Sequence, residues 1–136
     1  MKKIKSLLAA LLMILVLAGC SGKSLPDGMT EEALIDAGRE VLLLAVDGEF
    51  DTILEMMRDD VQATVTAEDI RTVVWGNVSD AGVYKQIEDS MTTGQDVNGE
   101  RLGVAVLYCD YSEDEVLFRA AFDSEMNLVG LSVQKQ

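Results

Sequence analysis

The stretch RLGVAVLYCDY, residues 101–111, decides the fold of this chain. Side chains of a strand alternate between the two faces of a sheet. Here both faces are apolar, one with Leu102, Val104, Val106 and Tyr108 and the other with Ala105, Leu107, Cys109 and Tyr111. Apolar side chains on both faces are typical of a central strand, so we expect residues 101–111 to have a neighbour on each edge.

Short strands separated by turn residues surround this stretch. We expect a modest strand over Val83–Glu88, a loop at Thr93–Asp96, and a turn at Asn98-Gly99. After the central strand come a hairpin connection at 112–115, a strand with Val116, Phe118, Ala120 and Phe122 on its buried face, a turn at 123–127 and a strand over Leu128–Val133. Consecutive strands joined by such short turns must be antiparallel.

The residues before this sheet have helical periodicity. Thr30 can cap a first helix that runs to about Val46, where Asp47-Gly48 ends it. Apolar residues recur at steps of three and four from Phe50 to Val61, which predicts a second helix, and Thr66 with Asp69 predicts the start of a third. Helices followed by an antiparallel sheet define the α+β class, with three helices packed on a curved sheet of about four strands.

The chain has 136 residues, enough for one domain, and no histidine. Without histidine it cannot form His-based zinc sites, Ser-His-Asp triads or Cys-His pairs. With 24 acidic and 11 basic residues its formal net charge is −13, which disfavours binding to nucleic acid. The composition gives no sign of a cofactor or a metal centre.

The first twenty residues have the pattern of a bacterial export signal. Lys2, Lys3 and Lys5 precede an apolar run over residues 7–18, which is too short for a membrane-spanning helix of roughly 20 residues. Leu17-Ala18-Gly19-Cys20 resembles the lipobox of bacterial lipoproteins, which implies cleavage before Cys20 and lipidation of its thiol. We therefore expect a signal peptide at 1–19, a lipidated Cys20 with a tether to residue 28, a domain at 29–136, and an extracytoplasmic location at the cell membrane.

Cleavage would change the charge and the thiol content of the chain. The mature protein keeps 24 acidic but only 8 basic side chains, a net charge of −16. Such a domain is repelled by anionic lipid surfaces and attracts cationic peptides, basic protein patches or metal ions. Cys109 becomes the only thiol not committed to lipid, and its apolar strand favours a small buried side chain over a reactive thiol.

Several short motifs between Leu34 and Leu131 resemble a bacterial family called domain of unknown function 3887. They are Asp47-Gly48-Glu49-Phe50-Asp51, Thr66-Ala67-Glu68, Trp75, Gly82-Val83-Tyr84-Lys85, Phe122-Asp123 and Asn127-Leu128-Val129-Gly130-Leu131. The resemblance implies a cone-like fold similar to nuclear-transport-factor-like and cystatin-like proteins. It implies no activity, but a cone can enclose a pocket, for which Trp75, Tyr84, Tyr108 and Phe122 are lining candidates or ordinary core residues.

Two acidic clusters are better explained by local structure than by metal binding. Asp47, Glu49 and Asp51 lack the loop and the closing glutamate of an EF-hand, so they fit the start of the second helix. Asp110, Glu113, Asp114 and Glu115 fit a solvated hairpin tip.

Arg119 is a charged residue in the middle of an expected strand. It shares a face with Leu117, Ala121 and Asp123, so it reaches water, pairs with Asp123, or belongs to a surface for a protein partner or a homodimer.

The sequence favours a non-enzymatic, lipid-anchored binding domain of unknown ligand. The alternative is a small hydrolase or isomerase that uses a buried aspartate or glutamate as its base.

Overall fold

A computed structural model describes residues 23–136. Four helices precede four strands, which confirms the α+β class. The expected signal peptide and Cys20 lie outside the described residues. The helices are α2 (Glu31–Val46), α3 (Phe50–Met56), α4 (Asp59–Gln62) and α5 (Ala67–Val78), and the strands are β1 (Tyr84–Val97), β2 (Glu100–Tyr111), β3 (Glu115–Phe122) and β4 (Leu128–Lys135).

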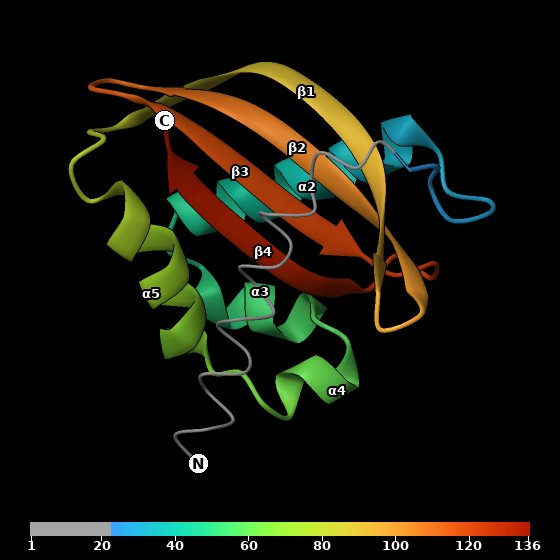
Figure 1. Cartoon of the computed structure of the whole chain (residues 1–136). Coiled ribbons are helices and arrows are strands. Elements are labelled where there is room, and N and C mark those ends of the chain that lie inside the picture. The colour runs from blue at the N-terminus through green and yellow to red at the C-terminus, as the bar shows by residue number, and fades with distance from the viewer. Residues whose placement is uncertain (1–22) are drawn as a thin grey trace.

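The strands form one antiparallel meander in the order β1-β2-β3-β4 (Figure 1). β2 lies between β1 and β3, as its two apolar faces predict. The turn between β1 and β2 is at Asn98-Gly99, where both residues have positive φ, as expected for a two-residue hairpin. The expected loop at Thr93–Asp96 is wrong, because these residues continue β1 and pair with residues 101–104 of β2.

The predicted second helix is divided in two. α3 ends at Met56 because Met57 is extended and forms a parallel bridge with Leu128, and the Arg58 N–H donates to the Leu128 carbonyl at 2.9 Å. Helical conformation resumes at Asp59, where the four-residue helix α4 begins. The pairing with the start of β4 therefore overrides the helical periodicity that runs from Phe50 to Val61.

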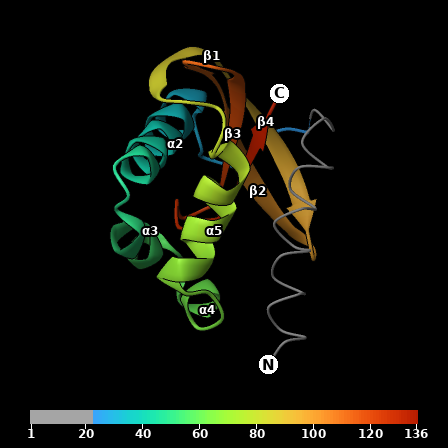
Figure 2. The ribbon, with the colours of Figure 1, turned by 90° about the vertical axis from the view of Figure 1, so that its left-hand side faces the viewer.

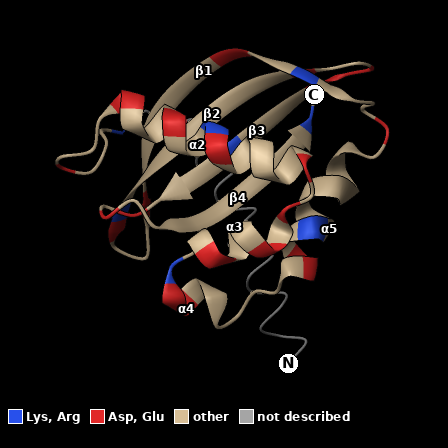
Figure 3. Ribbon diagram, turned by 180° about the vertical axis from the view of Figure 1, so that it is seen from behind, with Lys and Arg blue, Asp and Glu red and all other residues tan. Residues whose placement is uncertain are grey.

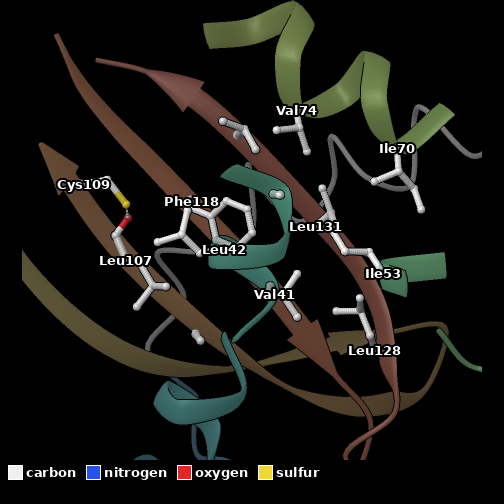
Figure 4. Close-up of a cluster of buried hydrophobic side chains, with 14 of the residues drawn as sticks. Val41, Leu42, Ile53, Ile70, Val74, Leu107, Cys109, Phe118, Leu128 and Leu131 are labelled. Carbon is white, nitrogen blue, oxygen red and sulfur yellow. Dashed lines mark hydrogen bonds between the residues drawn. The ribbon is translucent and has the colours of Figure 1, made fainter. Parts of the chain in front are cut away.

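The helices cover one face of the sheet, which we call the inner face (Figure 2). Phe118, Leu107 and Leu131 point from the strands toward Leu42 and Ile53 of the helices (Figure 4). The buried members of this helix–sheet core are all apolar. The packing is closest at Gly38 of α2, where an added Cβ would lie 2.6 Å from the Ala105 Cβ.

The two longer helices begin at the threonines expected from the sequence. The Thr30 hydroxyl accepts a hydrogen bond from the Ala33 N–H, and Thr66 and Asp69 form a complete capping box at α5. These caps satisfy amide groups that the first helical turn leaves free.

Replacement of Thr66 by alanine should lower the free energy of unfolding by about 1 kcal/mol, because the Asp69 N–H loses its acceptor. Thr72→Ala is the matched control, since its hydroxyl only donates back to the Glu68 carbonyl within the helix. Chemical denaturation of both variants checks the difference, and an equal loss in the two would contradict the capping role.

Residues 23–28 lie against the domain, unlike the free spacer that their composition suggests. Lys23 pairs with Gly94 at the open edge of β1, and Arg101 donates to the Ser24 carbonyl at 2.9 Å. Pro26 is buried and Leu25 packs against the core. The described chain is therefore fixed to the sheet from its first residue.

Candidate interaction face

The second face of the sheet points away from the helices, and we call it the outer face. Its apolar cluster comes from the strands alone, without any helical side chain among residues 23–136. The buried members are Leu102, Val104, Val106, Leu117 and Ala121, and Val97 and Val129 lie beside them. No described helix covers this apolar face.

Four polar residues lie within the same face. They are Thr93, Gln95, Arg119 and Ser132, with Gln95 1% and Arg119 9% exposed. The cross-strand pairs Gln95–Leu102, Val106–Arg119 and Arg119–Ser132 place them among the apolar side chains. The outer face therefore combines an apolar centre with groups that can form specific hydrogen bonds.

Most of these polar groups have no partner within the described chain. The unpaired atoms are Nε and Nη1 of Arg119, both amide atoms of Gln95 and the hydroxyl of Ser132. A buried polar atom without a hydrogen bond costs about 1 to 3 kcal/mol. All the buried unpaired side-chain atoms among residues 23–136 lie on the outer face. A molecule that covered this face would have to supply hydrogen-bond acceptors and donors as well as apolar contact.

Asp123 does not pair with Arg119, which was one expected alternative. Its carboxylate accepts from the Glu125 and Asn127 N–H groups at 3.0 and 2.8 Å, and from Nη1 of Arg58 at 3.3 Å. Burial disfavours the charge of Asp123, but the hydrogen bonds from Asn127, Glu125 and Arg58 outweigh it and lower its pKa.

Arg58 stands beside a polar hollow of about 570 Å³ between α3, α4 and the β3–β4 turn. Its guanidinium also donates to Asp60 at 2.8 Å and to Glu100 at 2.7 Å, and the three carboxylates together raise its pKa. Arg58 is therefore already neutralised and is poorly suited to bind an anion. Asp123 is the only buried carboxylate among the described residues, and it is fully engaged, so the acid–base enzyme alternative has no free buried base here.

The four aromatic pocket candidates do not converge. Phe122 is in the helix–sheet core, while Trp75 is 41% exposed on α5 with its ring 4.9 Å from Phe50. Tyr84 packs edge-on against Tyr111, and Tyr108 lies on the outer face at 37% exposure. Only Tyr108 therefore accompanies Arg119.

The acidic clusters lie at the expected corners, and Asp and Glu are spread over the helical side of the molecule (Figure 3). Glu49 is at the N-terminus of α3 without a side-chain cap, and Asp51 is in its first turn. Among residues 23–136 no three Cys, Asp or Glu side chains are placed to hold a metal ion. Cys109 is buried, and burial raises the pKa of its thiol to about 12.

The fold and the outer face together define a small α+β domain with one sheet face covered by helices and an apolar outer face that no described helix covers. The chain belongs to the family described as a protein of unknown function (DUF3887), whose model matches residues 39–131. It is similar to an NMR structure of a protein from Ruminococcus gnavus ATCC 29149, with 23% identity and a TM-score of 0.69 over 81% of this chain and 96% of that chain. This likeness concerns the fold.

No curated protein matches the sequence. No helix within residues 23–136 is long and apolar enough to cross a membrane.

Proposed function

We propose that this protein is a lipid-anchored extracytoplasmic domain that binds a protein partner through its outer face. The observation that carries the proposal is the coincidence of the apolar strand cluster with every buried unpaired side-chain atom of residues 23–136. The lipobox-like Leu17-Ala18-Gly19-Cys20 supports the location.

Exposed aromatic residues on the two sides of the molecule offer a test of the binding surface. A photo-crosslinking amino acid at Tyr108 should capture a partner in living cells, because Tyr108 borders the outer face. The same amino acid at Trp75, which is about equally exposed but on the helical side, should capture little or nothing. If position 108 yields no product above the level of position 75, the proposed binding surface is wrong.

The anchor can be tested separately. Cys20→Ala should abolish incorporation of a labelled fatty acid and retain the precursor, because the thiol that accepts the lipid is missing. Cys109→Ala is the control, since that thiol is buried and should not affect labelling. Gel mobility and fluorescence of the labelled acid measure both outcomes, and continued labelling of Cys20→Ala would contradict the anchor.

A further inference from the structure

We infer that the partner on the outer face is a second copy of the mature chain. This inference rests on the proposed function and specifies the occupant of the same surface. Cleavage before Cys20 would leave only residues 20–22 ahead of the described part, so the expected mature N-terminus is too short to cover the outer face. Three residues reach at most about 11 Å and cannot cover four strands.

The unpaired polar atoms are complementary to each other across a two-fold axis. Val104 on β2 is the central residue of this face. Arg119 lies on the neighbouring strand β3, two residues from the position opposite Val104, and Gln95 lies on the other neighbour β1, displaced by two residues in the opposite direction along the strands. Each offset is about 8 Å, from the strand spacing and the rise per residue. The two side chains are therefore placed symmetrically about the middle of the apolar cluster.

Stacking two outer faces brings these atoms together. Consider a two-fold axis that lies midway between the stacked sheets and passes over Val104. If this axis is perpendicular to the line from Arg119 to Gln95, it places each Arg119 opposite the Gln95 of the second copy. Nε and Nη1 of Arg119 then donate to the Gln95 amide oxygen, an unpaired acceptor. The two guanidinium groups stay about 16 Å apart in projection, twice the offset from the axis.

The charge distribution fits the same arrangement. Arg119 is the one charged residue among the buried side chains around the apolar cluster of the described strands, whereas the carboxylates of Asp110 and Glu115 lie at the more exposed end of the same face. Two copies at −16 each repel one another through their carboxylates, those at the rim of the outer face included. Screening by salt should therefore strengthen the dimer, whereas a basic partner would bind more weakly at high salt.

The size of the surface predicts a weak, reversible dimer. Four strands and the six steps from Leu102 to Tyr108 span roughly 19 by 20 Å, or about 400 Å² in projection. Stable interfaces of standard size bury about 800 Å² per partner. We therefore expect a dimer that dissociates on dilution.

Sedimentation equilibrium of the processed, lipidated protein in excess detergent tests the inference. The dimer should tighten when salt rises from about 0.1 M to about 1 M, as the screening length falls from about 10 Å to about 3 Å. Val104→Lys should weaken it at least tenfold, and Leu43→Lys, on the exposed side of α2, should leave it unchanged. A monomer at all concentrations, weakening by salt, or equal effects of the two lysine variants would overturn the inference.

Gln95→Glu provides a second test that does not depend on a disruptive variant. A carboxylate opposite Arg119 of the second copy should tighten the dimer about tenfold, and Arg119→Ala should remove that gain. No gain, or a gain that persists in the Arg119→Ala background, would overturn the pairing. The photo-crosslink at Tyr108 distinguishes failure of the self-association from failure of the proposed function. A product with the mass of a different protein would overturn the self-association and leave the proposed binding function in place.

Discussion

Replacement of Gly38 by valine is expected to lower the free energy of unfolding by about 3 kcal/mol. A Cβ at this position would lie 2.6 Å from the Ala105 Cβ, and Leu107 closes the site on another side. The backbone fixes the position of this Cβ, so no rotation about χ1 relieves the contact, and the two methyl groups of valine add further crowding. α2 would have to move away from β2, which would disturb the helix–sheet core around Leu34 and Val41.

Gly76→Val in α5 is the matched control, because an added Cβ there meets no atom within 4 Å. The same change should be neutral or slightly stabilising at Gly76, since glycine disfavours a helix interior. Urea denaturation of both variants measures the difference. Similar losses at the two positions would contradict the close approach of α2 to β2 as the cause of the effect.

Asp123→Ala should lower the free energy of unfolding by about 2 to 3 kcal/mol. The carboxylate is 5% exposed and organises the β3–β4 turn through the N–H groups of Glu125 and Asn127. Its loss leaves those N–H groups without their acceptor and removes one of the three carboxylates around Arg58. Arg58 keeps Asp60 and Glu100, so the expected loss stays below that of a completely broken buried ion pair.

Asp123→Asn distinguishes the role of the charge from the role of shape. The folded pKa of Asp123 is below its ordinary value of 3.8, so the charge stabilises the fold fully above that value and progressively less as the pH falls through the folded pKa. The stability difference between wild type and Asp123→Asn should be constant from pH 7 to about 5 and shrink below about 4. Denaturation curves across this range measure it, and a difference independent of pH would contradict the assignment.

Local patterns in the sequence predicted most of the fold. The alternation in residues 101–111, the Asn98-Gly99 turn and the capping pair Thr66 and Asp69 each specify structure through near neighbours, and all three are confirmed. The break at Met57 was missed because it depends on pairing with Leu128, far along the chain. Thr93–Asp96 was misassigned because polar residues and a glycine resemble a loop unless the paired strand is known.

The candidate site was predicted only in part, for the same reason. Arg119 is conspicuous by itself, since a charge interrupts an apolar strand. Gln95 was hidden within the supposed loop, and Ser132 is an ordinary strand residue whose importance comes from its position opposite Arg119. The pocket-lining role of Trp75, Tyr84, Tyr108 and Phe122 depended on the resemblance to a cone, and no sequence pattern shows that these rings point in different directions.

The fixed position of residues 23–28 affects how copies of the protein would meet. With Lys23 paired to Gly94, only Ser21 and Gly22 would separate a lipidated Cys20 from the sheet edge. On the proposed lipid anchor, a linker this short would hold the domain at the bilayer surface and confine it to diffusion in two dimensions. Confinement raises the local concentration of neighbours by shortening the search between them. A contact too weak to persist among molecules dissolved in three dimensions could then be populated at ordinary surface densities.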